Sequence, residues 1–160
     1  MKFIKVFLLS LFLLNSIAIY TQINNSLVLN GCTDYLEIPD NDLLDYNQVI
    51  SIECWIRPNC DDQNRVFISK EWCNGEYGYY LSVNNGRLFW SYSINGNCSS
   101  PNSFRTVNQL IPAGEFTHIA VVHNQESIKL FVNGTEVLSE QNNGVFGLIH
   151  ESSEPLRIGA

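Results

Sequence analysis

The recurrence of Asn-Gly pairs between short alternating segments constrains this chain more than any other feature. Six such pairs occur, at residues 30–31, 74–75, 85–86, 95–96, 133–134 and 143–144. Asn and Gly accept the positive φ angles of type I′ turns, which join neighbouring antiparallel strands. After residue 22, no segment keeps a helical period over three turns. The sequence therefore predicts a series of β-hairpins.

Strand patterns flank two of these pairs and recur along the chain. The two predicted hairpins join residues 79–83 with 87–92 and residues 127–132 with 135–138. Further strands are predicted at residues 26–29, 35–38, 50–57, 65–70 and 116–123. Strands spaced by roughly 8–12 residues with turns between them indicate one all-β sandwich or barrel.

Alternation also predicts which side chains form the core. Trp90 and Tyr92 share a strand face with Leu88, and Ile94 continues that face, so these side chains are predicted to be buried. In the strand at 50–57, Trp55 opposes the apolar face. The sequence leaves open whether Trp55 lines the concave face of the sandwich or lies under a loop.

The first 22 residues have the features of a secretory signal peptide. Lys2 and Lys5 precede an apolar run, Val6 to Tyr20, that is shorter than the ~20 residues of a membrane-spanning helix. Cleavage after Ala18 fits the small-residue rule, and cleavage after Thr21 is the alternative. The mature protein is therefore predicted to be secreted, extracellular or at the cell surface, with no membrane insertion after cleavage.

The charge of the predicted mature chain restricts its partners. Seven basic and sixteen acidic residues remain after removal of Lys2 and Lys5, which gives a formal charge of −9. An acidic domain without a Lys/Arg cluster is a poor ligand for nucleic acid or an anionic membrane. Carbohydrate, extracellular protein and divalent cations remain as partner classes.

Export makes structural disulfides the expected role of the cysteines. Five cysteines are present: Cys32, Cys54, Cys60, Cys73 and Cys98. A meander of strands near 65–70, 78–83 and 87–93 would bring Cys73 and Cys98 to the same end of a sheet, so we predict a disulfide between them. Cys32 with Cys60 is the second pairing that the sequence suggests. Cys54 is predicted to be buried and free.

Four ordered segments resemble a known family. They are residues 27–31 with 34–39, residues 50–58, residues 116–122 with 128–134, and residues 155–159. Together they resemble the laminin-G-like domain of the concanavalin A-like lectin/glucanase superfamily, in its bacterial secreted form. The resemblance covers nearly all of residues 26–160 and implies an antiparallel, two-sheet jelly-roll sandwich over residues 23–160. Phe116 stands where the family usually has Trp.

The resemblance also implies a feature beyond the end of this chain. Family members continue with a Gly-x-Ile-Asp-Glu-Val strand that pairs with the N-terminal strand, whereas this chain ends at Ala160. We therefore expect the domain to lack its closing C-terminal strand and to be part of a larger polypeptide.

Catalysis is not predicted for these residues. Superfamily members that cleave β-glucans resemble one another in a Glu-x-Asp-x-x-Glu strand, whose two glutamates act as nucleophile and acid. That spacing does not occur here, nor does another catalytic motif. His118 lies in an apolar strand and is predicted to be structural.

Calcium is a possible cofactor that the resemblance implies, because some relatives bind it at the rim of the sandwich. Ca²⁺ prefers several oxygen ligands, including carboxylates. The candidate ligands are Asp34, Asp40 and Asp42. The alternative is that these residues only form solvated turns.

An exposed aromatic side chain with polar neighbours is the candidate sugar site. Trp72 is the first candidate, with Tyr77, Tyr80 and Asn97 as further candidates. The predicted function is a secreted, non-catalytic recognition or adhesion module that binds carbohydrate. The alternatives are a structural or protein-interaction domain of a larger surface protein, or an accessory domain of a secreted glycan-processing enzyme.

Overall fold

The computed structural model describes residues 26–30, 33–59, 64–144 and 146–159. The predicted signal peptide, Cys32 and Cys60 lie outside the described residues. The elements, in chain order, are β1 Leu36–Ile38, the 3₁₀ helix η1 Asp42–Leu44, β2 Ile50–Ile56, β3 Arg65–Trp72, β4 Glu76–Asn84, β5 Arg87–Gly96, β6 Asn102–Arg105, β7 Thr117–His123, β8 Ser127–Val132, β9 Thr135–Gln141 and β10 Leu156–Ile158. No helix in this described part is long and apolar enough to cross a membrane.

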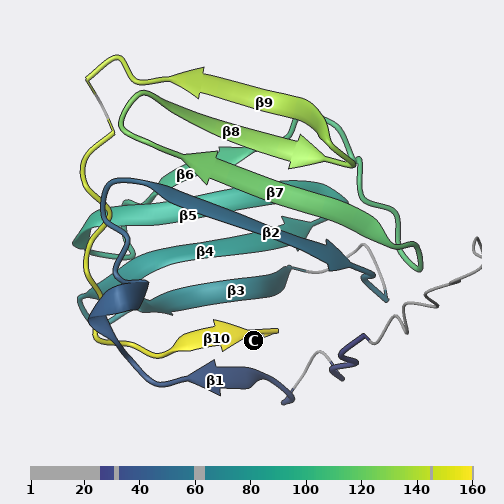
Figure 1. Cartoon of the computed structure of the whole chain (residues 1–160), viewed down its shortest axis with the longest axis horizontal. Helices are drawn as coiled ribbons and strands as arrows, with labels where there is room; N and C mark the ends of the chain where they lie inside the picture. The colour runs from purple at the N-terminus through teal and green to yellow at the C-terminus, as the bar shows by residue number, and fades with distance from the viewer. Residues whose placement is uncertain (1–25, 31–32, 60–63, 145, 160) are drawn as a thin grey trace, which may run out of the picture.

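The strands form two antiparallel sheets that face each other (Figure 1). One sheet has six strands in the order β1-β10-β3-β4-β5-β6, and the other has four in the order β2-β7-β8-β9. The prediction of an all-β, two-sheet sandwich is confirmed.

Two Asn-Gly pairs form the predicted hairpin turns. Asn85 and Gly86 have φ angles of 49° and 67° between β4 and β5, and Asn133 and Gly134 have φ angles of 50° and 75° between β8 and β9. Both residues of each pair thus have the positive φ of a type I′ turn.

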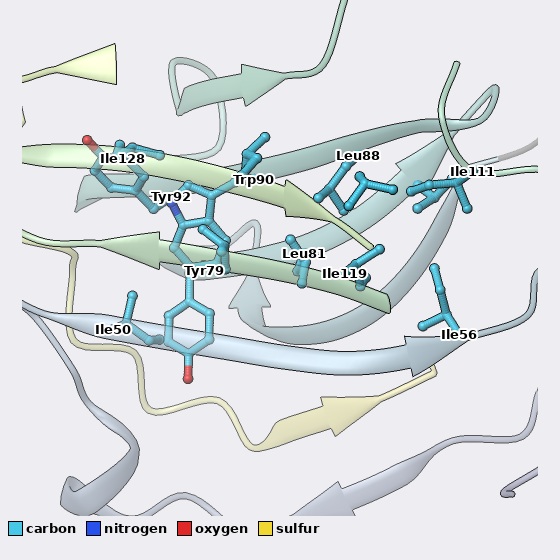
Figure 2. Packing of buried hydrophobic residues seen from close by; sticks show 14 of the residues in the cluster. Ile50, Ile56, Tyr79, Leu81, Leu88, Trp90, Tyr92, Ile111, Ile119 and Ile128 are labelled. Atoms are coloured by element: carbon cyan, nitrogen blue, oxygen red, sulfur yellow. The ribbon is translucent and has the colours of Figure 1, made fainter. Parts of the chain in front are cut away.

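Aromatic and aliphatic side chains fill the space between the sheets (Figure 2). Trp90, Tyr92 and Leu88 are fully buried, as predicted. The prediction for Ile94 is wrong, because this side chain is 51% exposed. Between Tyr92 and Gly96, β5 has two more residues than β4 has between Tyr79 and Tyr77. This register shift breaks the alternation, so Ser93 is buried and Ile94 is exposed.

The N-terminal part of the domain differs from the prediction. The structure assigns no strand to residues 26–29, where Leu27 and Val28 are 58% and 81% exposed. β1 instead pairs with β10, with Leu36 opposite Ile158, and β10 pairs with β3. β1 and β10 therefore lie side by side at one edge of the six-stranded sheet (Figure 1).

Candidate functional site

The outer face of the four-stranded sheet carries an exposed tryptophan. In β2, residues Ile52, Cys54 and Ile56 pack toward the core, so Trp55 points to the opposite side. Trp55 lies opposite His118 in the β2–β7 register and is 65% exposed. Of the two places that the sequence left open for Trp55, a place under a loop does not agree with this exposure.

A shallow depression of about 520 Å³ surrounds this tryptophan. Trp55, His118, Asn133 and Gly134 line it. The Trp55 and His118 rings are 5.4 Å apart between centroids and inclined at 59°. The indole ring therefore forms an open apolar wall beside a polar ring, a combination that suits a small ligand with both apolar and hydroxyl-bearing faces.

The β8–β9 turn is fixed against β7 beside the tryptophan. The Asn133 Oδ1 accepts a hydrogen bond of 3.0 Å from the His118 backbone N–H, and the Asn133 N–H donates to the His118 carbonyl at 2.8 Å. These bonds hold the Asn133 side chain at the rim. Its Nδ2 amino group donates to no other group in the described part of the chain, so it is open to a ligand.

Charged groups flank the depression along β2. Glu53 Oε2 lies 3.6 Å from His118 Nε2, and the Glu53 side chain is 74% exposed. On the other side of Trp55, the Arg57 guanidinium lies 5.3 Å from the centroid of the exposed Phe116 ring. The face therefore offers an indole surface between hydrogen-bond acceptors and donors.

Trp72 and Asn97 lie elsewhere, at one end of the six-stranded sheet. Trp72 is the last residue of β3, which runs two residues beyond the strand predicted at 65–70, and it is 54% exposed. Asn97 is exposed too, but its Oδ1 accepts from the Ser99 N–H at 2.8 Å, which is a turn-forming role. Both side chains therefore remain accessible, Trp72 in the six-stranded sheet and Asn97 just after it, away from the Trp55 depression on the four-stranded sheet.

Tyr77 does not offer an open ring, contrary to the prediction. It is 5% exposed, its hydroxyl lies 2.9 Å from Ser91 Oγ, and burial raises its pKa well above the ordinary value. Tyr80, which is half-buried, packs edge-on against Tyr77 with centroids 6.0 Å apart. No ring contact joins Trp72 to either tyrosine in the residues that the structure describes.

The predicted calcium ligands are not gathered at one point. Asp40 Oδ1 is 2.6 Å from Lys70 Nζ, Asp34 accepts from the Asn30 N–H at 3.2 Å, and Asp42 begins η1. Among the described residues, no group of three or more His, Cys, Asp and Glu side chains could hold a metal ion. Binding of Ca²⁺ is therefore only what the resemblance implies, and the described residues offer no preformed cluster of the three ligands.

The three cysteines in the described part of the chain, Cys54, Cys73 and Cys98, are free thiols in the structure. Cys73 and Cys98 lie at the same end of the six-stranded sheet, where Cys98 Sγ is 3.8 Å from the Cys73 carbonyl. Their disulfide stays a prediction. Cys54 is half-buried against the core, and burial raises its pKa to about 11.

Sequence reasoning missed the Trp55 depression as a site, and it assigned His118 a purely structural role. One signal was present, because Trp55 interrupts a polar strand face with a large apolar side chain. The proximity of His118 and Asn133 follows from strand register, which no local pattern specifies.

Comparison with solved structures shows the same fold in several proteins. The binding domain of Paraclostridial Mosquitocidal Protein 1 is 18% identical with a TM-score of 0.63, over 82% of this chain and 34% of that one. Domains LG4-5 of the mouse laminin α1 chain are 15% identical with a TM-score of 0.59, over 78% and 31%. This chain thus spans about a third of these structures. A search of curated protein sequences gives no match.

A smaller relative matches over more of its own length. The CBM40 domain of the Ruminococcus gnavus IT-sialidase, solved with α2,6-sialyllactose, is 10% identical with a TM-score of 0.60, over 74% of this chain and 68% of that one. The family model of the concanavalin A-like lectin/glucanases superfamily matches residues 30–160. Since that match covers most of the chain and agrees with the two-sheet fold, this protein belongs to the laminin-G-like branch of the concanavalin A-like lectin/glucanase superfamily.

Proposed function

We propose that this domain is a non-catalytic recognition module of an exported protein and that it binds carbohydrate at the Trp55 depression. The observation that carries the proposal is the exposed indole of Trp55, 65% accessible and flanked by polar groups of Glu53, His118 and Asn133. An accessible aromatic ring with hydrogen-bonding groups beside it suits a binding site, because the ring offers apolar contact area and the polar groups orient the ligand.

The chemistry of the depression fits a sugar. A sugar ring has an apolar face of C–H groups, which can pack on the indole, and a rim of hydroxyls. The Glu53 carboxylate accepts hydrogen bonds from hydroxyls, and the Asn133 Nδ2 donates to them. The shallow shape, about 520 Å³ in volume, suits one or two sugar rings rather than a deeply enclosed cofactor.

The relatives support a binding role without fixing the ligand. One relative was solved with α2,6-sialyllactose, and another is described as the binding domain of a mosquitocidal protein. The absence of a Glu-x-Asp-x-x-Glu sequence supports a non-catalytic role. The predicted signal peptide supports export, and therefore access to extracellular glycans.

A glycan array with the purified wild-type protein, W55A and W72A tests this proposal. Trp72 is the matched control, because it is 54% exposed and lies outside the depression. We expect wild type and W72A to bind the same glycans and W55A to lose them.

Two other outcomes would overturn parts of the proposal. If W72A loses binding and W55A keeps it, the site lies at Trp72, where the sequence placed it. If wild type binds no glycan but retains an extracellular protein from its own source, with W55A losing that protein, the domain is a protein-interaction module instead.

A further inference from the structure

Two turns are in direct backbone contact at one end of the six-stranded sheet. Tyr77 pairs with Gly96, which places the β3–β4 turn, residues 73–75, against the end of β5. Gly96 has a φ of 74°, and a Cβ atom there would overlap the Gly75 carbonyl. Only glycine therefore permits the close approach of the two segments.

This approach brings two cysteines together, one from each segment. Cys98 Sγ lies 3.8 Å from the Cys73 carbonyl oxygen. The neighbouring Cys98 side chain is the main cause that raises the pKa of the Cys73 thiol to about 11. Cys73 is exposed and Cys98 is half-buried, so a small-molecule oxidant can reach the pair.

We propose that Cys73 and Cys98 form a disulfide that fastens the β3–β4 turn to the segment after β5. The bond forms by exchange with a low-molecular-weight disulfide. One thiolate attacks the small disulfide and releases one small thiol, and the second cysteine then displaces the other. The two cysteines lose two hydrogens and two electrons in all, and the small disulfide becomes two thiols.

The disulfide lies at the end of the six-stranded sheet where Trp72 and Asn97 are found, since these residues directly precede the two cysteines. It closes a loop that contains all of β4 and β5, and it stabilises the fold mainly by restricting the unfolded chain. The Trp55 depression lies on the other sheet, so this inference does not depend on the proposed carbohydrate function.

Equilibration of the purified protein with oxidised glutathione at mildly alkaline pH, followed by non-reducing peptide mapping, tests the proposal. We expect one peptide pair joined through Cys73 and Cys98. Reduction should lower the melting temperature by roughly 10 °C, as expected for a loop of this length in a domain of this size. C73S should have the melting temperature of the reduced protein, and this temperature should no longer depend on whether the buffer is oxidising or reducing.

C54S is the matched control, because Cys54 lies on β2, in the other sheet. It should keep the Cys73–Cys98 peptide and its redox-dependent melting, even if the substitution itself lowers stability. A map in which Cys73 and Cys98 stay free after oxidation, or in which either is linked to another cysteine, would overturn the proposal.

Discussion

The ammonium nitrogen of Lys70 lies 2.6 Å from Oδ1 of Asp40 although Lys70 is only 1% exposed. Asp45 Oδ1 at 3.1 Å and the carbonyl oxygens of Ser152 and Glu154 complete its surroundings. This buried cation thus connects β3 with the segment around η1 and with the segment before β10. Asp40, which the sequence suggested as a calcium ligand, is thus paired with the buried ammonium group of Lys70.

Substitution of Lys70 by methionine should destabilise the domain strongly. K70M removes the cation and leaves Asp45, which is 17% exposed, and two carbonyl groups without their partner. Loss of one member of a buried ion pair costs about 3 kcal/mol, measured as the free energy of unfolding in urea. The control is K129M, since the Lys129–Glu136 pair lies at the surface and should contribute under about 1 kcal/mol. Equal effects of the two substitutions would contradict the role given to Lys70.

Calcium provides a second test of the same cluster. Because Asp40 is already paired with Lys70, we expect millimolar CaCl₂ and EDTA to give the same melting temperature for the wild-type protein. A rise in the melting temperature with Ca²⁺ that D40N removes would show instead that Asp40 is a calcium ligand, as the sequence suggested.

A buried histidine should make the sandwich sensitive to acid. His123 is 1% exposed, packs against Tyr92 with ring centroids 4.6 Å apart, and has no hydrogen-bond partner for either ring nitrogen in the described part of the chain. Burial lowers its pKa from 6.5 to about 4. Between these values the unfolded chain takes up a proton that the folded chain does not, so stability falls as the pH falls from about 6.5 to 4.

His123 alone should reduce the free energy of unfolding by about 3 kcal/mol, and the full reduction is reached below pH 4. Carboxylates titrate in the same range, so the measurement is a comparison of urea unfolding curves at several pH values for wild type and H123L. Between pH 6.5 and 4, the free energy of unfolding should fall by about 3 kcal/mol less in H123L than in wild type. Parallel pH profiles for the two proteins would contradict the assignment.

The two tryptophans of the six-stranded sheet should differ in their effect on stability. Trp90 is fully buried in the core (Figure 2), so W90A should cost about 3–5 kcal/mol. W72A removes an exposed side chain and should stay within about 0.5 kcal/mol of wild type. Thermal or urea unfolding distinguishes the two, and a large loss with W72A would show that its ring is packed.

The strands could be predicted where local alternation is strong. Residues 50–57 alternate over their whole length, and β2 forms at Ile50–Ile56. β6 was missed because Phe104 is the only apolar residue in Asn102–Arg105, which leaves no pattern to recognise. Residues 26–29 have a good strand pattern but form no strand, because strand formation also depends on a partner distant in sequence.

The candidate site was less predictable than the fold. Exposure of Trp72 followed from its polar neighbours, but Tyr77 is covered because a shift of register in β4 turns it toward Ser91. The Trp55 depression needs the register of β2 against β7 and the placement of the β8–β9 turn. These are relations between distant residues, and a one-residue slip would move Trp55 away from His118.

The tryptophan indole N–H signals in a two-dimensional NMR titration test the central claim most directly. The chain has three tryptophans, which lie in three different environments: Trp55 in the depression, Trp72 at the end of β3 and Trp90 in the core. Single Trp→Phe variants assign the signals, and the glycan that binds best on the array is the ligand. The Trp55 signal should shift progressively to saturation while the Trp72 and Trp90 signals stay in place. A saturable shift of the Trp72 signal with an unmoved Trp55 signal would contradict the claim that this domain binds carbohydrate at Trp55.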